Sequence, residues 1–75
     1  MEEVKKILQS ILPDVELEGQ KALFEDGILN SFAIVDLIAK LSAAFDIRIR
    51  PKYLVPENFN SLEAIWEMVQ TIRDE

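Results

Sequence analysis

Ser31 is the residue whose type and position best suit chemistry. Gly27 punctuates the connection before it, and the apolar pair Ile28 and Leu29 can pin the end of that connection to a core. Asn30 is one of the preferred N-cap residues, so a helix is predicted to begin at Ser31. The hydroxyl would then lie in the first helical turn, where backbone N–H groups lack partners and the dipole is positive. A phosphate ester would be stabilised there, and we predict that Ser31 is an attachment point for a phosphorylated group.

The residue types that are missing narrow the chemistry further. The chain has no histidine, which excludes Ser-His and Cys-His pairs and histidine-ligated metals. It has no cysteine, which excludes disulfides, thiolate nucleophiles and iron–sulfur clusters. The alternating acidic loop of an EF-hand is also absent, so we expect no metal site. The paired carboxylates Glu25 and Asp26 stand next to each other on a loop, in a chain too small to enclose an active site. We therefore expect no catalytic residue and no enzyme.

Length and charge set the class of protein. A chain of 75 residues is expected to form one domain, residues 1–75, with a compact core. Its net charge of −6 argues against nucleic acid as a partner and favours encounters with basic protein surfaces. No apolar run has the length of a membrane span, and the N-terminal residues lack the apolar core of a secretion signal. We expect a cytoplasmic monomer.

Apolar spacing predicts a first helix over residues 2–12, with Val4, Ile7, Leu8 and Ile11 on one face and Pro13 ending it. Residues 13–30 then form a long connection, in which the alternation around Val15 and Leu17 permits a short strand. A loop of this length in a small domain is uncommon unless it is functional or held down. We expect four apolar residues to hold it down, namely Leu23, Phe24, Ile28 and Leu29.

A second helix is predicted over residues 31–45, because apolar residues follow one another at helical spacing: Phe32, Val35, Ile38, Leu41 and Phe45. Ile34 and Leu37 widen this stripe beyond one face. The helix is therefore either sandwiched between neighbours, or it keeps an apolar patch free for a partner. Asp36 and Lys40 stand four residues apart and are expected to form an ion pair on a solvated face.

The remaining residues predict one short and one long helix. Residues 46–50 alternate like an extended segment, and a short helical turn is predicted over residues 51–54. Phe59 is expected to be buried. A last helix is predicted over residues 61–73, with Asn60 as its N-cap and Glu63 completing a capping box. Its core stripe is Leu62, Ile65, Val69 and Ile72; Trp66 is expected to border the core and Met68 to be more exposed. The fold class is all-α, a bundle of three main helices and one short helix.

With these elements placed, the chain resembles the acyl carrier protein family, which includes peptidyl and D-alanyl carriers. The central motif is Phe24-Glu25-Asp26-Gly27-Ile28-Leu29-Asn30-Ser31-Phe32, similar to the family pattern of Gly, two apolar residues and Asp-Ser-Leu. The resemblance extends to Phe45-Asp46-Ile47 and to Pro56-Glu57-Asn58-Phe59-Asn60-Ser61-Leu62-Glu63. It implies a small acyl-carrier-like bundle in which Ser31 carries 4'-phosphopantetheine, whose thiol holds the cargo as a thioester.

Two departures from the family pattern bear on recognition. Asn30 stands where the family usually has Asp, which preserves the helix cap and removes a charge that a transferase could read. Asp36 is the one acid among the central residues of the second helix, unlike in fatty-acid carriers. The resemblance then implies docking through Phe32, Val35 and Ala39 into an apolar pocket, as in D-alanyl or peptidyl carriers. The predicted docking residues are Asn30, Phe32, Val35, Asp36 and Ala39.

The partners follow from the resemblance. They are a phosphopantetheinyl transferase, an adenylating ligase or acyltransferase that loads the thiol, and downstream enzymes that use the acyl group. We favour a stand-alone D-alanyl or peptidyl carrier; the sequence leaves the cargo open. The alternative is a non-catalytic helical adaptor that binds a partner through the second helix and carries no arm.

Overall fold

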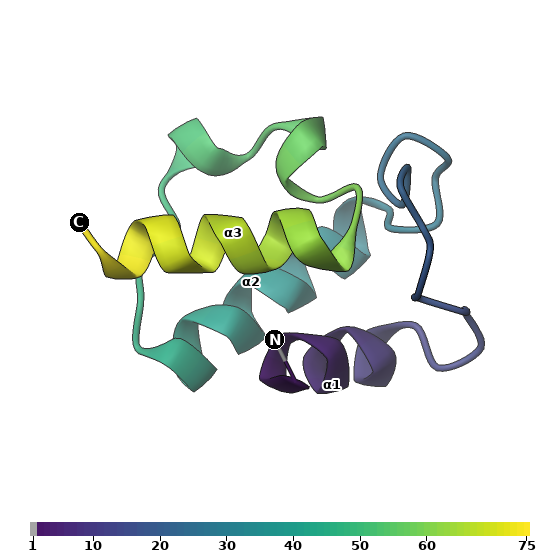
Figure 1. The fold of residues 1–75 in the computed structure, drawn as a ribbon, viewed down its shortest axis with the longest axis horizontal. Helices are drawn as coiled ribbons and strands as arrows, with labels where there is room; N and C mark the ends of the chain where they lie inside the picture. Colours follow the sequence, from purple (N-terminus) through teal and green to yellow (C-terminus); the bar gives the residue numbers. More distant parts are fainter. Residues whose placement is uncertain (1) are drawn as a thin grey trace.

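The computed structural model describes residues 2–75, and within this range it contains helices and no strand (Figure 1). The elements in chain order are α1 (Glu2–Ile11), α2 (Ser31–Phe45), η1 (Pro51–Tyr53), η2 (Pro56–Asn58) and α3 (Leu62–Arg73). The all-α prediction is confirmed. The strand permitted around Val15 and Leu17 does not form, and the turn expected over residues 55–59 contains a short 3-10 helix, η2, which was not predicted. Pro56 begins η2 with the backbone angle that a first helical residue needs, which makes this turn possible.

Helix α1 covers residues 2–11 of the predicted 2–12 because of the proline that follows. A residue that precedes proline is disfavoured in helical conformation, and Leu12 precedes Pro13. Its N–H still donates to the carbonyl of Leu8 at 2.8 Å, so the last turn is closed. Val4 and Leu8 are fully buried, with Ile7 and Ile11 packed against the core, which confirms the predicted face.

Helix α3 corrects two predictions. Its N-cap is Ser61, whose hydroxyl accepts a hydrogen bond from the N–H of Ala64 at 3.0 Å, and not Asn60. Glu63 is therefore one position too early to complete a capping box. Met68, expected to be the more exposed, is buried with 3% of its surface accessible. Met68 is buried because α3 packs against α1 and also against η2, so more than one stripe of the surface of α3 is covered.

The helices enclose one core, to which the long loop also contributes. α1 packs against both α2 and α3, and η2 packs against α3 (Figure 1). The loop over residues 12–30 lies at one end of the molecule, and the C-terminal end of α3 lies at the other. Leu23 and Leu29 of this loop are fully buried, with Phe24 and Ile28 packed beside them, as predicted. The buried side chains are Val4, Leu8, Leu17, Leu23, Leu29, Leu37, Leu41, Phe59, Leu62, Ile65, Met68, Val69 and Ile72.

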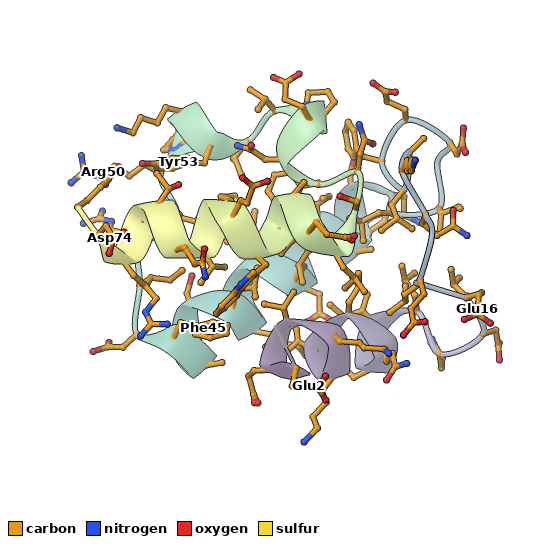
Figure 2. The ribbon with its side chains drawn as sticks, viewed as in Figure 1. Glu2, Glu16, Phe45, Arg50, Tyr53 and Asp74 are labelled. Atoms are coloured by element: carbon orange, nitrogen blue, oxygen red, sulfur yellow. The ribbon has the colours of Figure 1, made fainter. Side chains whose placement is uncertain are left out.

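Polar side chains lie at the two ends of this core. Glu16 extends from the outer side of the long loop, while Arg50, Tyr53 and Asp74 lie at the opposite end (Figure 2). Within residues 2–75, no helix combines the length and the apolar composition needed to cross a membrane.

An exposed ion pair joins α1 to the long loop and makes stability depend on pH. Lys5 donates to the carboxylate of Glu18 at 2.5 Å, which lowers the pKa of Glu18 and raises the pKa of Lys5. A lowered carboxyl pKa stabilises the fold above the ordinary glutamate pKa, and this stabilisation disappears as the pH falls through the lowered value. The raised lysine pKa stabilises the fold below the ordinary lysine pKa, and this stabilisation is lost as the pH rises through the raised value.

We expect Glu18→Gln to lower the melting temperature slightly at neutral pH, because a solvated pair contributes little. The difference between the variant and the parent should shrink as the pH is lowered from neutral into the acidic range, because protonation of the parent carboxylate removes the ion pair. Thermal unfolding followed by circular dichroism at neutral and acidic pH checks this. Glu25→Gln, which removes an acid without an ion pair in the described part of the chain, serves as the control. An equal loss in both variants would show that the Lys5 contact contributes nothing.

Candidate functional site at the head of helix α2

Ser31 is placed by the turn and the cap that precede it. Gly27 has a φ of +78°, a left-handed conformation that glycine adopts without strain. Asn30 then stops the turn: its side-chain oxygen accepts from the N–H of Ala33 at 2.9 Å, and its carbonyl accepts from the N–H of Ile34 at 2.9 Å. Asn30 is thus the N-cap, and α2 begins at Ser31 as predicted.

The surroundings of the Ser31 hydroxyl fit a phosphate ester. Ser31 is exposed, and its hydroxyl makes no hydrogen bond with any described residue. Among residues 2–75, the backbone N–H groups of Ser31 and Phe32 likewise have no acceptor. The first turn contains no acidic side chain that would repel an anion. A phosphate on the hydroxyl would therefore meet two donors without a partner and the positive end of the α2 dipole.

An exposed apolar patch adjoins Ser31. Phe32 exposes 88% of its surface, Val35 68% and Leu54 47%, and we call these three residues the exposed apolar patch. Of the two alternatives for the wide stripe of α2, the second therefore holds: Leu37 and Leu41 face the core, while Phe32 and Val35 remain uncovered. Large apolar side chains gathered on a surface mark interaction sites more often than isolated ones do.

The other predicted docking residues follow along α2. Ala39 is exposed and stands four residues after Val35, which places it on the same helical face. Asp36 is paired with Lys40 at 3.2 Å, as predicted, so its charge is locally compensated.

A small apolar groove lies between Ser31 and the connection that joins η1 to η2. Its volume is about 240 Å³, and we call it the serine groove; it is lined by Phe24, Ser31, Ile34, Val35, Leu54, Val55 and Phe59. The sequence reasoning missed Leu54 and Val55 as site residues. The sequence did contain one signal for them. Leu54 and Val55 are consecutive apolar residues between Pro51 and Pro56, and a segment this short is not expected to bury both side chains in the core. Both residues line the groove because the connection between η1 and η2 lies beside the head of α2.

The paired acids that an enzyme would need do not form such a site. Glu25 and Asp26 are both exposed in the turn before Gly27, and neither lines the serine groove. Within residues 2–75, no three His, Cys, Asp or Glu side chains come together in a way that could hold a metal ion.

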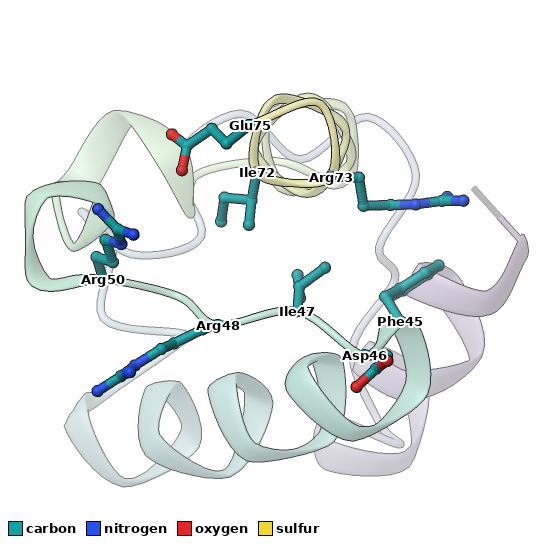
Figure 3. A pocket seen from close by; sticks show the side chains of 8 residues that line it. All are labelled: Phe45, Asp46, Ile47, Arg48, Arg50, Ile72, Arg73 and Glu75. Carbon is teal, nitrogen blue, oxygen red and sulfur yellow. The ribbon is translucent and has the colours of Figure 1, made fainter.

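A second depression, of about 470 Å³, lies at the far end of α2 (Figure 3). Ile47 and Ile72 point into it from opposite sides, while Arg48, Arg50 and Arg73 stand around it and point in different directions. An anion site requires donors that converge on one point. Because these arginines diverge, they do not form an anion site.

Three curated relatives illustrate what the chain is similar to. It is 42% identical over 53 residues to a D-alanyl carrier protein of Lactococcus lactis subsp. lactis, covering 71% of this chain and 67% of the relative. It is 32% identical over 73 residues to a D-alanyl carrier protein of Streptococcus thermophilus, covering 96% and 92%. It is 30% identical over 66 residues to aminoacyl carrier protein 2 of Bradyrhizobium diazoefficiens, covering 88% and 73%. No family model matches the chain, and no solved structure matches it significantly.

A helical bundle that presents one serine at the exposed head of a helix has the form of a small carrier. The chain belongs to the acyl carrier protein family, and its role is that of a carrier. The helical adaptor without an arm is accordingly not favoured.

Proposed function

We propose that this carrier holds an aminoacyl group on 4'-phosphopantetheine attached to Ser31. The observation that carries the proposal is the exposed Ser31 hydroxyl beside two backbone N–H groups that lack acceptors in residues 2–75. When bound, the arm supplies a flexible tether and a thiol that holds the cargo as a thioester. The chain itself supplies no catalysis: Ser31 anchors, Asn30 fixes the helix start, and the exposed apolar patch offers a surface to partner enzymes.

The aminoacyl cargo is inferred from the relatives and from the shape of the site. Two of the relatives described above carry the name D-alanyl carrier protein and the third is an aminoacyl carrier protein. The serine groove is small and opens to solvent, which suits a small cargo held outside the protein. We propose D-alanine as the first amino acid to test. An adenylating ligase would load it, and we place this work in the cytoplasm, where ATP and coenzyme A are available.

The arm would be installed by a phosphopantetheinyl transferase. The Ser31 oxygen would form the new bond to phosphorus, the bond to the nucleotide half of coenzyme A would break, and the transferase would take the hydroxyl proton. Asn30 brings no negative charge to this site, so the transferase would have to recognise the helix head through contacts other than an acidic side chain.

The experiment is intact-mass measurement after incubation with coenzyme A, magnesium and a broad-specificity phosphopantetheinyl transferase. We expect the parent to gain one phosphopantetheinyl group and Ser31→Ala to gain none. Ser10→Ala, which removes another exposed hydroxyl, should be modified like the parent. Modification of Ser31→Ala would show that the arm is attached elsewhere. An unmodified parent, with the transferase active on a control carrier, would contradict the proposal.

A further inference from the structure

The side chain of Asn60 holds the loop that leads to Ser31. Its oxygen Oδ1 accepts hydrogen bonds from the backbone N–H groups of Phe24 and Glu25, both at 3.1 Å. The backbone carbonyl of the same residue accepts from the N–H of Leu23 at 2.9 Å. Because both partners of the side chain are donors, the oxygen of the side-chain amide, and not its NH2 group, must face the loop. One residue thus binds three consecutive N–H groups that no helix or strand satisfies.

The segment that Asn60 binds is also held together by hydrogen bonds within its own backbone. We call this segment, residues 22–29, the serine loop. The N–H of Leu29 donates to the carbonyl of Leu23 at 2.8 Å, and the N–H of Asp26 donates to that of Ala22 at 2.7 Å. The side chains of Leu23 and Leu29 are fully buried. The next residue, Asn30, caps α2. A short series of contacts therefore connects the Asn60 oxygen with the position of Ser31.

Asn60 also brings together two walls of the serine groove. Phe24, whose N–H it binds, lines the groove from the loop side. Phe59, its neighbour in sequence, also lines the groove and is almost completely buried. The serine groove therefore depends on a contact between residues 36 positions apart in the chain.

The Asn60 side chain does not serve as a helix cap. The N-cap of α3 is Ser61, and the Asn60 side chain is directed to the loop instead. We propose that Asn60 is a positioning residue, which fixes the serine loop against the start of α3 so that Ser31 is presented in the geometry its modifying enzyme requires. This inference rests on the proposed function of Ser31.

The test compares Asn60→Ala, Asn60→Asp and Ser61→Ala with the parent. Ser61→Ala is the matched control, because it removes a cap from the same turn without touching the serine loop. The measurements are the kcat/KM of phosphopantetheine transfer by mass spectrometry and the hydrogen exchange of the Phe24 and Glu25 amides. Both are made at a temperature at which circular dichroism shows all four proteins folded.

We expect Asn60→Ala to speed exchange at these two amides about tenfold through local opening of the loop. We expect its kcat/KM to fall about tenfold, since small misplacement of a reacting group is costly. Asn60→Asp keeps an acceptor oxygen and should stay within about twofold of the parent in both measurements. Ser61→Ala should lower the melting temperature while leaving exchange and kcat/KM within about twofold.

Equal losses of kcat/KM in Asn60→Ala and Ser61→Ala would overturn the proposal, because Asn60 would then act only through stability. The proposal would also be overturned if the Asn60→Asp variant were folded but had the fast exchange and low kcat/KM expected of Asn60→Ala. A parent that accepts no arm would overturn the proposed function and this role together. The two failures are distinguishable, because the first appears only in the variants and the second already in the parent.

Discussion

Leu29→Ala is expected to remove about 2–5 kcal/mol from the free energy of unfolding, the usual cost of a cavity left by a buried leucine. Leu29 is fully buried, although it belongs to the loop and not to a helix. A chain of 75 residues has a total stability of roughly 4–11 kcal/mol, at about 0.05–0.15 kcal/mol per residue. The loss is therefore a large part of the total. Leu29, a loop residue, would then contribute as much to the free energy of unfolding as a buried residue of a helix.

Urea unfolding followed by tryptophan fluorescence checks this expectation. Trp66 is the single tryptophan, and its ring lies 6.0 Å from that of Phe45, so its emission should change when the core opens. Leu54→Ala is the matched control, because Leu54 is 47% exposed and should cost less than about 1 kcal/mol. Similar losses in the two variants would contradict a core role for the loop.

Phe32→Ala is expected to leave the fold intact and to weaken docking to the phosphopantetheinyl transferase. Because Phe32 exposes 88% of its surface, its removal should change the free energy of unfolding by no more than about 0.5 kcal/mol. An aromatic side chain at the centre of an interface commonly contributes about 2 kcal/mol or more to binding. We therefore expect kcat/KM for the phosphopantetheinyl transferase to fall roughly 30-fold, the equivalent of that energy.

The measurement is the initial rate of arm transfer at low carrier concentration, beside a melting curve for each protein. Gln9→Ala, an exposed substitution on α1, should behave like the parent in both. A normal transfer rate in folded Phe32→Ala would place the docking surface for this enzyme elsewhere. A lowered melting temperature would instead show that Phe32 stabilises the fold, against its exposure in the structure.

Local rules explain what the sequence could predict. Asn30 caps α2 through a contact three residues away, so the start of this helix could be predicted from neighbouring residues. The face of α1 is equally local, because Val4 and Leu8 are one turn apart and Pro13 limits the helix. The predicted burial of Leu23, Leu29 and Phe59 is also confirmed, because removing large apolar side chains from water is favourable wherever the chain can reach the core.

The predictions that were wrong or missing concern features that depend on contacts between residues far apart in the chain. Asn60 and Ser61 are both good caps, but in the fold the Asn60 side chain binds Phe24 and Glu25, far away in the chain, and Ser61 caps α3. Met68 is buried because η2 covers its side of α3, which helical periodicity does not reveal. The serine groove likewise requires Leu54 and Val55 to fold over α2. Residue type could mark Leu54 and Val55 as apolar residues in a short segment, but it could not show which helix they lie against.

We also expect the contact between Asn60 and the serine loop to form late during synthesis. Chains emerge from the ribosome N-terminus first, and contacts between distant residues form later than helices do. Ser31 is made early, but its loop cannot be fixed until Asn60 and the start of α3 have been added. We therefore expect a nascent chain that ends before residue 60 to be a poor substrate for the transferase. The arm would then be attached almost exclusively to chains that have finished folding.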